Sequence, residues 1–111
     1  MTQENKDLLL RDLCARLPYG VKVKTNNINI LRLGTHTRVG EYVTDVIEPC
    51  KPYLFPLSSM TEEQIDSLTK FVANGIQGKN ILYDWYNKNN FDYRGLIPLG
   101  LAIDCTNLNI Y

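Results

Sequence analysis

The chain has 111 residues, and its 12 basic and 12 acidic side chains give a formal net charge of zero at pH 7. This balance excludes a strong overall attraction to nucleic acids or anionic membranes. Neither a linker nor a repeat interrupts the sequence, so we expect residues 1–111 to form a single domain. No apolar run approaches the ~20 residues of a membrane span, which predicts no membrane partner.

Cysteine and histidine usage argues against metal chemistry. The three cysteines (Cys14, Cys50 and Cys105) are far apart, and His36 is the sole histidine. Their spacing fits neither a zinc site nor a disulfide framework. We therefore predict a reduced, cytoplasmic protein without a metal or a cofactor.

An N-terminal helix is the first predicted element, and it ends near Arg16 because Pro18 disfavours the α conformation in the residue before it. Thr2 or Asn5 can cap its start. Leu9, Leu13 and Leu17 repeat at four on one face, with Leu10 and Cys14 beside them, and Cys14 is expected to be a small core side chain. Charged side chains, including Asp12 and Arg16, are expected on the outer side.

Alternating and β-branched runs then predict a small sheet. Residues 21–24 alternate as a half-buried strand does, and residues 28–33 are the expected return strand. The β-branched run 39–47 predicts a third strand, and residues 53–55 can add a fourth. Short consecutive strands joined by tight turns predict an antiparallel β-meander of three to four strands over about residues 21–55.

The chain then changes from strand to helix. Pro52 and Pro56 confine the fourth strand to an edge or a strand end. Thr61 and Gln64 have the spacing of a capping box, which predicts a helix that ends at Gly75. The apolar side chains that share one face of this helix are Ile65, Leu68, Phe71 and Val72. An amphipathic stripe of this kind predicts a core-facing helix.

A second C-terminal helix is expected from residue 81 to about Lys88, with Asn80 as its cap. Asp92 is then expected to cap a turn that is limited by Pro98. The apolar residues 101–103 can form a buried strand added to the sheet. The complete prediction is an α+β fold, in which the meander packs with the N-terminal helix and the two C-terminal helices.

Aromatic residues are concentrated in the back half of the chain. They are Tyr83, Trp85, Tyr86, Phe91 and Tyr93. We expect Trp85 and Phe91 to be core anchors, with Tyr83 and Tyr86 at the rim of the core. The alternative is that these rings, beside Lys88 and Arg94, stack on the bases of a single-stranded nucleic acid.

Three blocks of the sequence carry a resemblance. They read LCARLPYGV at residues 13–21, KPYLFPLSSMT at residues 51–61, and FDYRGLI at residues 91–97 followed by GLAID at residues 100–104. In this order they resemble a family of short uncharacterised proteins of anaerobic gut bacteria, often carried by phages or mobile elements. The resemblance implies an accessory, intracellular role, and it implies no catalytic residue because the family has no named activity.

Three functions remain open at this stage. The first is a small non-catalytic protein-interaction module, because the sequence contains no assembled reactive constellation. The second is a nucleic-acid-binding accessory protein, and the third is an enzyme with a site around Tyr93, Arg94 and Asp104. Self-association also stays open.

The candidate binding surface combines the most function-like local signature, Asp92-Tyr93-Arg94-Gly95, with basic strand residues. That signature can equally be a plain structural turn. The candidate residues are Tyr93, Arg94, Tyr86, Lys22, Lys24, Arg32 and Arg38. His36 lacks the carboxylate or cysteine partner that a catalytic histidine needs.

Overall fold

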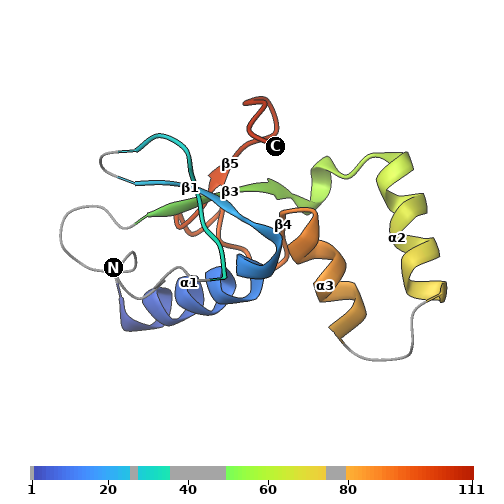
Figure 1. Ribbon diagram of the computed structural model, residues 1–111, viewed down its shortest axis with the longest axis horizontal. Coiled ribbons are helices and arrows are strands. Elements are labelled where there is room, and N and C mark those ends of the chain that lie inside the picture. The colour runs from blue at the N-terminus through green and yellow to red at the C-terminus, as the bar shows by residue number, and fades with distance from the viewer. Residues whose placement is uncertain (1, 26–27, 36–49, 75–79) are drawn as a thin grey trace.

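The structure is a computed structural model, which describes residues 2–25, 28–35, 50–74 and 80–111 (Figure 1). His36, Arg38, the predicted strand 39–47 and the predicted helix end at Gly75 lie outside the described residues. Within the described part, three helices and a mixed sheet form an α+β fold, which confirms the predicted class.

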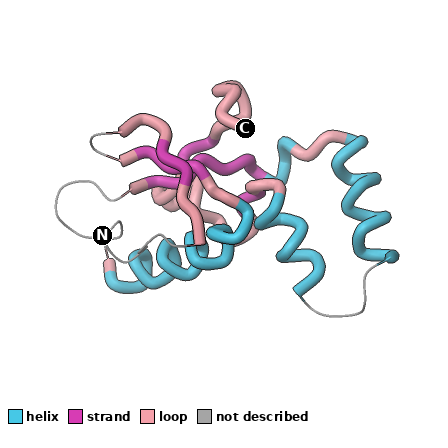
Figure 2. The backbone as a smooth tube through the Cα atoms, in the orientation of Figure 1, coloured by secondary structure: helices cyan, strands magenta, loops and turns pink. Residues whose placement is uncertain are grey.

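In the described part of the chain, one helix is followed by three strands, then two helices, then two strands (Figure 2). The helices are α1 (Gln3–Arg16), α2 (Glu62–Asn74) and α3 (Asn80–Lys88), with short 3-10 turns at Leu17–Tyr19 and Leu57–Ser59. The strands are β1 (Lys22–Lys24), β2 (Leu31–Arg32), β3 (Lys51–Pro56), β4 (Phe91–Asp92) and β5 (Ile103–Asp104).

The sheet is mixed: the described strands of residues 21–55 pair antiparallel, as predicted, but their order is not that of a meander, and two parallel strands join them. Its strand order is β2-β1-β3-β4, and β5 also pairs with β3. The strand β1 is antiparallel to both β2 and β3, so β1 and not β2 lies in the middle of this group. The strands β4 and β5 are both parallel to β3. Parallel pairing needs a long crossover, which the chain between β3 and β4, containing α2 and α3, provides.

The strand β3 has three partners, so it is not an edge strand; its prolines instead fit the strand-end alternative, since Pro52 is its second residue and Pro56 its last. Residues two apart in a strand turn their backbone groups to the same edge, so Pro52 and Pro56 remove N–H groups from one edge only. Between them, Leu54 O accepts a hydrogen bond from Cys105 N at 3.0 Å. The N–H of Phe55 points to the opposite edge and donates to Asn90 O at 2.8 Å.

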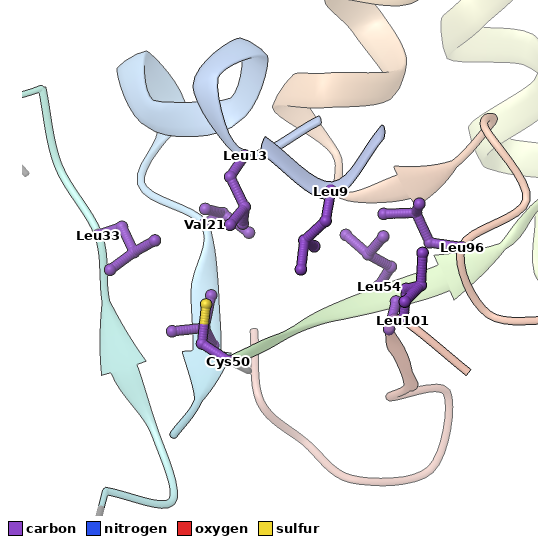
Figure 3. Close-up of a cluster of buried hydrophobic side chains, with 10 residues drawn as sticks. Leu9, Leu13, Val21, Leu33, Cys50, Leu54, Leu96 and Leu101 are labelled. Atoms are coloured by element: carbon purple, nitrogen blue, oxygen red, sulfur yellow. The ribbon is translucent and has the colours of Figure 1, made fainter. Parts of the chain in front are cut away.

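The apolar core lies between α1 and the sheet (Figure 3). Its buried members are Leu9, Leu13, Val21, Val23, Leu33, Cys50, Leu54, Leu96, Leu101 and Ala102. The helix α1 begins with a hydrogen bond from Asn5 N to Thr2 Oγ1, which identifies Thr2 as the cap. The 3-10 turn Leu17–Tyr19, which contains Pro18, then ends the helix at Arg16, as predicted.

The buried face of α1 differs from the predicted one. It consists of Leu9, Asp12, Leu13 and Arg16, whereas Cys14 is exposed. The prediction failed because Asp12 and Arg16 pair with each other four residues apart. A neutralised pair can enter a core that a single charge cannot.

The helix α2 forms as predicted, but its environment is different. Gln64 N donates to Thr61 Oγ1 at 3.2 Å and Thr61 N donates to Gln64 Oε1 at 2.8 Å, which completes the capping box. The prediction that its apolar stripe faces the core was wrong, because Ile65, Phe71 and Val72 are exposed. The helix lies at one end of the molecule, with α3 between it and the sheet (Figure 1).

Candidate functional site

An open cleft of about 600 Å³ lies where α1, α3 and the loop after β4 meet. Its lining residues are Ala15, Tyr83, Asp84, Asn87, Tyr93 and Arg94. Two of the sequence-predicted surface residues, Tyr93 and Arg94, therefore lie in a concave site. Its volume falls within the ~300–1,000 Å³ of small-molecule pockets.

Asp92 shapes the loop that carries these two residues. Its carboxylate accepts hydrogen bonds from Leu96 N and Ile97 N, both at 2.9 Å, and the side chain is buried. This confirms Asp92 as the cap of a turn. Gly95 has a φ of +78°, a left-handed conformation that favours glycine. In the signature Asp92-Tyr93-Arg94-Gly95, the first and last residues therefore shape the turn. The two residues between them, Tyr93 and Arg94, line the cleft.

Tyr83 and Tyr93, which line the cleft, belong to a stack of three tyrosines whose third member, Tyr86, does not line it. The ring of Tyr93 stacks with Tyr83 at 5.0 Å between centroids and with Tyr86 at 5.6 Å. Trp85 and Phe91 stack on each other beneath them and are buried, as predicted for core anchors. Tyr83 remains 47% exposed, so much of its surface faces solvent.

Behind the lining of the cleft, Arg94 adjoins the buried ion pair of Asp12 and Arg16. Arg16 donates from Nε to Asp12 Oδ2 at 2.8 Å and from Nη2 to Asp12 Oδ1 at 3.1 Å, and both side chains are fully buried. Arg94 Nε also lies 3.4 Å from Asp12 Oδ1, but it makes no hydrogen bond there. Arg94 Nη2 donates to the hydroxyl of Tyr93 at 2.8 Å.

Three buried polar atoms have no hydrogen-bond partner among the described residues. They are Arg16 Nη1, Arg94 Nε and Asn87 Oδ1. Arg94 and Asn87 line the cleft, and Asn87 is only 5% exposed. Leaving a buried polar group unsatisfied costs about 1–3 kcal/mol. The sequence analysis missed Asn87 and the Asp12–Arg16 pair, and only the i, i+4 spacing of that pair could have signalled it.

Comparison of the chain with protein-family models, with curated proteins and with solved structures finds no match. Function must therefore be argued from the geometry of the chain itself.

The remaining candidate residues lie on the strands. Lys22 is the register partner of Arg32, and Lys24 is the register partner of Lys51, a cation that the sequence analysis did not select. These side chains share the face of the sheet opposite the buried Val23. Four basic residues therefore form one strip, which we call the basic strip (Lys22, Lys24, Arg32 and Lys51).

The last residue of the chain covers part of the same sheet face. The Tyr111 hydroxyl accepts from Lys22 N at 2.8 Å and donates to Tyr53 O at 2.9 Å, so it bridges β1 and β3. Lys22 Nζ donates to Ile110 O at 2.7 Å, which ties one cation of the strip to the chain end. Burial raises the pKa of the Tyr111 phenol above its ordinary value, so the hydroxyl remains a donor.

Asp104, the third residue of the enzyme hypothesis, is held elsewhere. It does not line the cleft, and its exposed carboxylate accepts hydrogen bonds from Thr106 N and Thr106 Oγ1. These hydrogen bonds lower the pKa of Asp104, which disfavours it as a general base. The structure therefore brings Tyr93 and Arg94 together without this carboxylate.

Neither a cluster of metal-ligating side chains nor a membrane-spanning helix is found among the described residues. In residues 2–25, 28–35, 50–74 and 80–111, no cluster of three or more His, Cys, Asp or Glu side chains could hold a metal ion. Nor is any described helix long and apolar enough to cross a bilayer. Burial raises the pKa of both the Cys50 and the Cys105 thiol to about 11, so neither is a thiolate at neutral pH.

Proposed function

We propose that this protein is a small, non-catalytic protein-interaction module and that the apolar face of α2 binds its partner. The observation that supports this proposal is the exposure of that face. Ile65 is 50% exposed, Phe71 is 40% exposed and Val72 is 47% exposed, although they share one side of a well-capped helix. Contiguous exposed apolar residues on a soluble chain are typical of an interaction site.

The polar residues of α2 are distributed as a binding helix requires. At 100° per residue, Asp66 and Lys70 lie on the side of the helix opposite Leu68, and they pair with each other at 3.7 Å. The flanks of the apolar face carry the uncharged Ser67 and Thr69. Depletion of charge at the centre is the compositional feature of protein interfaces, and an amphipathic helix that fills an apolar groove is a recurring binding mode.

The setting of this interaction is proposed on the family resemblance. The three sequence blocks support an accessory role in the cytoplasm, in a cell that carries the gene on a phage or mobile element. The partner is a protein of that host or element, and a second copy of the chain is the alternative occupant.

Site-specific photo-crosslinking in the native cell tests the proposal. A photo-crosslinking amino acid is placed at Val72, and the matched control carries it at Asp66, on the opposite side of the same helix. We expect a discrete crosslinked protein from position 72 that is absent from position 66. The Phe71→Asp variant should abolish it, and sedimentation of the purified chain identifies a self-association product. Equal crosslinking from both positions, or persistence in Phe71→Asp, would contradict the proposal.

Nucleic-acid binding is the second candidate, and the basic strip supports it. Lys24 and Arg32 are exposed and lie on one sheet face with Lys22 and Lys51. Phosphate contacts of this kind give binding that weakens steeply with salt. Gel shifts with single- and double-stranded DNA and RNA at low salt should show a complex that Lys24→Glu with Arg32→Glu removes. No shift at micromolar protein rules this candidate out.

A further inference from the structure

The cleft between α1 and α3 is lined by one cation, Arg94, and one carboxylate, Asp84, and a buried ion pair lies behind Arg94. The two guanidinium groups of Arg16 and Arg94 meet a single carboxylate, that of Asp12. Arg16 takes both oxygens of Asp12 in a bidentate pair, so Arg94 has no carboxylate of its own among the described residues. The Arg94 side chain is 20% exposed and lines the cleft, where it can receive an anionic group.

The walls of the cleft add two further requirements on a ligand. Tyr83 stacks on Tyr93 and is 47% exposed, so its ring offers a surface to a planar group. Asp84 and Asn87 present acceptor oxygens, and the buried Oδ1 of Asn87 has no donor within the described part of the chain. A ligand that fits must therefore bring N–H donors beside its planar ring.

We propose that this cleft is a nucleotide-binding site. The phosphate of the nucleotide binds Arg94, the base stacks on Tyr83, and the N–H groups of the base edge donate to Asp84 and Asn87. A planar nitrogen heterocycle linked to a phosphate is the ligand class that meets all three requirements together. The same chemistry is present in a free mononucleotide and in the terminal nucleotide of a single strand.

The site is independent of the apolar face of α2. The α2 face uses Ile65, Phe71 and Val72, none of which lines the cleft. The Phe71→Asp variant should consequently lose the protein partner and keep nucleotide binding, so the two proposals can fail separately.

Calorimetric titration of the full chain tests the site. The probes are the 5′-monophosphates of guanosine, adenosine, cytidine and uridine, the corresponding nucleosides, and 5′-phosphorylated hexanucleotides. We expect at least one monophosphate to bind and its nucleoside to bind about tenfold more weakly, because the nucleoside lacks the group that Arg94 holds. Tighter binding of the hexanucleotide than of the monophosphate identifies a strand end as the natural source.

Paired variants separate this site from general electrostatics. Arg94→Gln and Tyr83→Ala should each weaken binding about tenfold. Their matched controls are Arg11→Gln, an exposed arginine on α1, and Tyr19→Ala, an exposed tyrosine, and both should retain wild-type affinity. Because Tyr83 is largely exposed, Tyr83→Ala folds whatever the fate of Arg94→Gln, and circular dichroism verifies this.

Several results would overturn the proposal. Absence of binding by all four monophosphates at millimolar concentration is one, and equal weakening by Arg11→Gln and Arg94→Gln is another. A high-resolution structure grown with nucleotide that shows only ordered water beside Asn87 and Arg94 would also overturn it, because water would then explain the unpaired atoms.

Discussion

The helices α1 and α2 offer an instructive contrast. The sequence of α2 has the cleaner apolar stripe, yet three of its four stripe residues are exposed. The helix α1 includes Asp12 and Arg16 in its inner face, yet that face is fully buried against the sheet. Apolar periodicity therefore shows that a helix face is suited to burial, but not whether the same chain or another protein buries it. For α2, we propose that a partner protein buries the apolar face.

The largest expected effect is a loss of stability when the buried Asp12–Arg16 ion pair of α1 is broken. Asp12→Ala leaves Arg16 buried without a counter-ion, and it should lower the free energy of unfolding by about 3–5 kcal/mol in urea titrations. Replacing both partners, by Asp12→Leu with Arg16→Met, should recover most of this loss. A loss below about 1 kcal/mol in Asp12→Ala would mean that the pair is solvated.

Truncation of apolar residues compares the two helices directly. Leu13→Ala in α1 should destabilise the protein by about 2–5 kcal/mol, because it opens a cavity in the core. Ile65→Ala in α2 should change the stability of the isolated protein by about 0.5 kcal/mol or less. Equal losses, measured by urea unfolding of dilute protein, would show that α2 is already covered in the free chain.

The buried thiols of Cys50 and Cys105 predict a loss of stability in base. Their pKa is raised to about 11 in the folded protein, whereas an unfolded thiol ionises near about 8.5, so the folded state binds more protons between these values. The stabilisation is complete below about pH 8.5 and is lost as the pH rises toward 11. We expect a loss of at most about 2 kcal/mol per thiol by pH 10.

Urea titrations from pH 8 to pH 10.5 measure this loss, and Cys50→Ala should flatten the pH profile. Cys14 is exposed and provides an internal comparison. It should react with a thiol reagent in the native protein well before Cys50 and Cys105. Equal reaction of all three thiols would contradict the burial of the two core cysteines.

A local effect is expected at the α2 cap. Thr61→Ala removes the side-chain acceptor of Gln64 N and should destabilise the helix by about 1 kcal/mol. Since α2 packs against α3 and contributes nothing to the core between α1 and the sheet, the change should remain local. Hydrogen exchange should accelerate in α2 and stay unchanged in α1. A fall in global stability of similar size would show that α2 is coupled to the core.

Local signals in the sequence were sufficient to predict where helices and strands form. They were insufficient to predict which strands pair with each other. Thr61 and Asp92 were predicted as caps, and Thr2 as one of two candidates, because each uses backbone groups a few residues away. The class of fold followed from the same local patterns. The parallel pairing of β3 with β4 and β5 did not, because such pairs join segments about 35 to 50 residues apart and leave no local pattern.

For the candidate site too, local signals in the sequence predicted some residues and missed others. Tyr93 and Arg94 stood out in the sequence as a polar pair in a turn, and the structure places both in the cleft. Asn87 reaches it from α3, and the Asp12–Arg16 pair of α1 lies behind Arg94; their separation along the chain conceals the arrangement. Lys51 was overlooked for a related reason, since only the strand register brings it beside Lys24.

The position of β3 has a consequence for the protein during synthesis. Its parallel partner β5 begins at Ile103, 47 residues after β3 ends at Pro56. At about 5–20 residues per second, a ribosome needs roughly 2–10 s to translate this stretch. During that interval the backbone groups of Tyr53 and Leu54 that β5 later engages are unpaired, and an open strand edge can recruit a neighbouring nascent chain. Pro52 and Pro56, which flank this short opening, limit the length of ladder that an intruding strand could form.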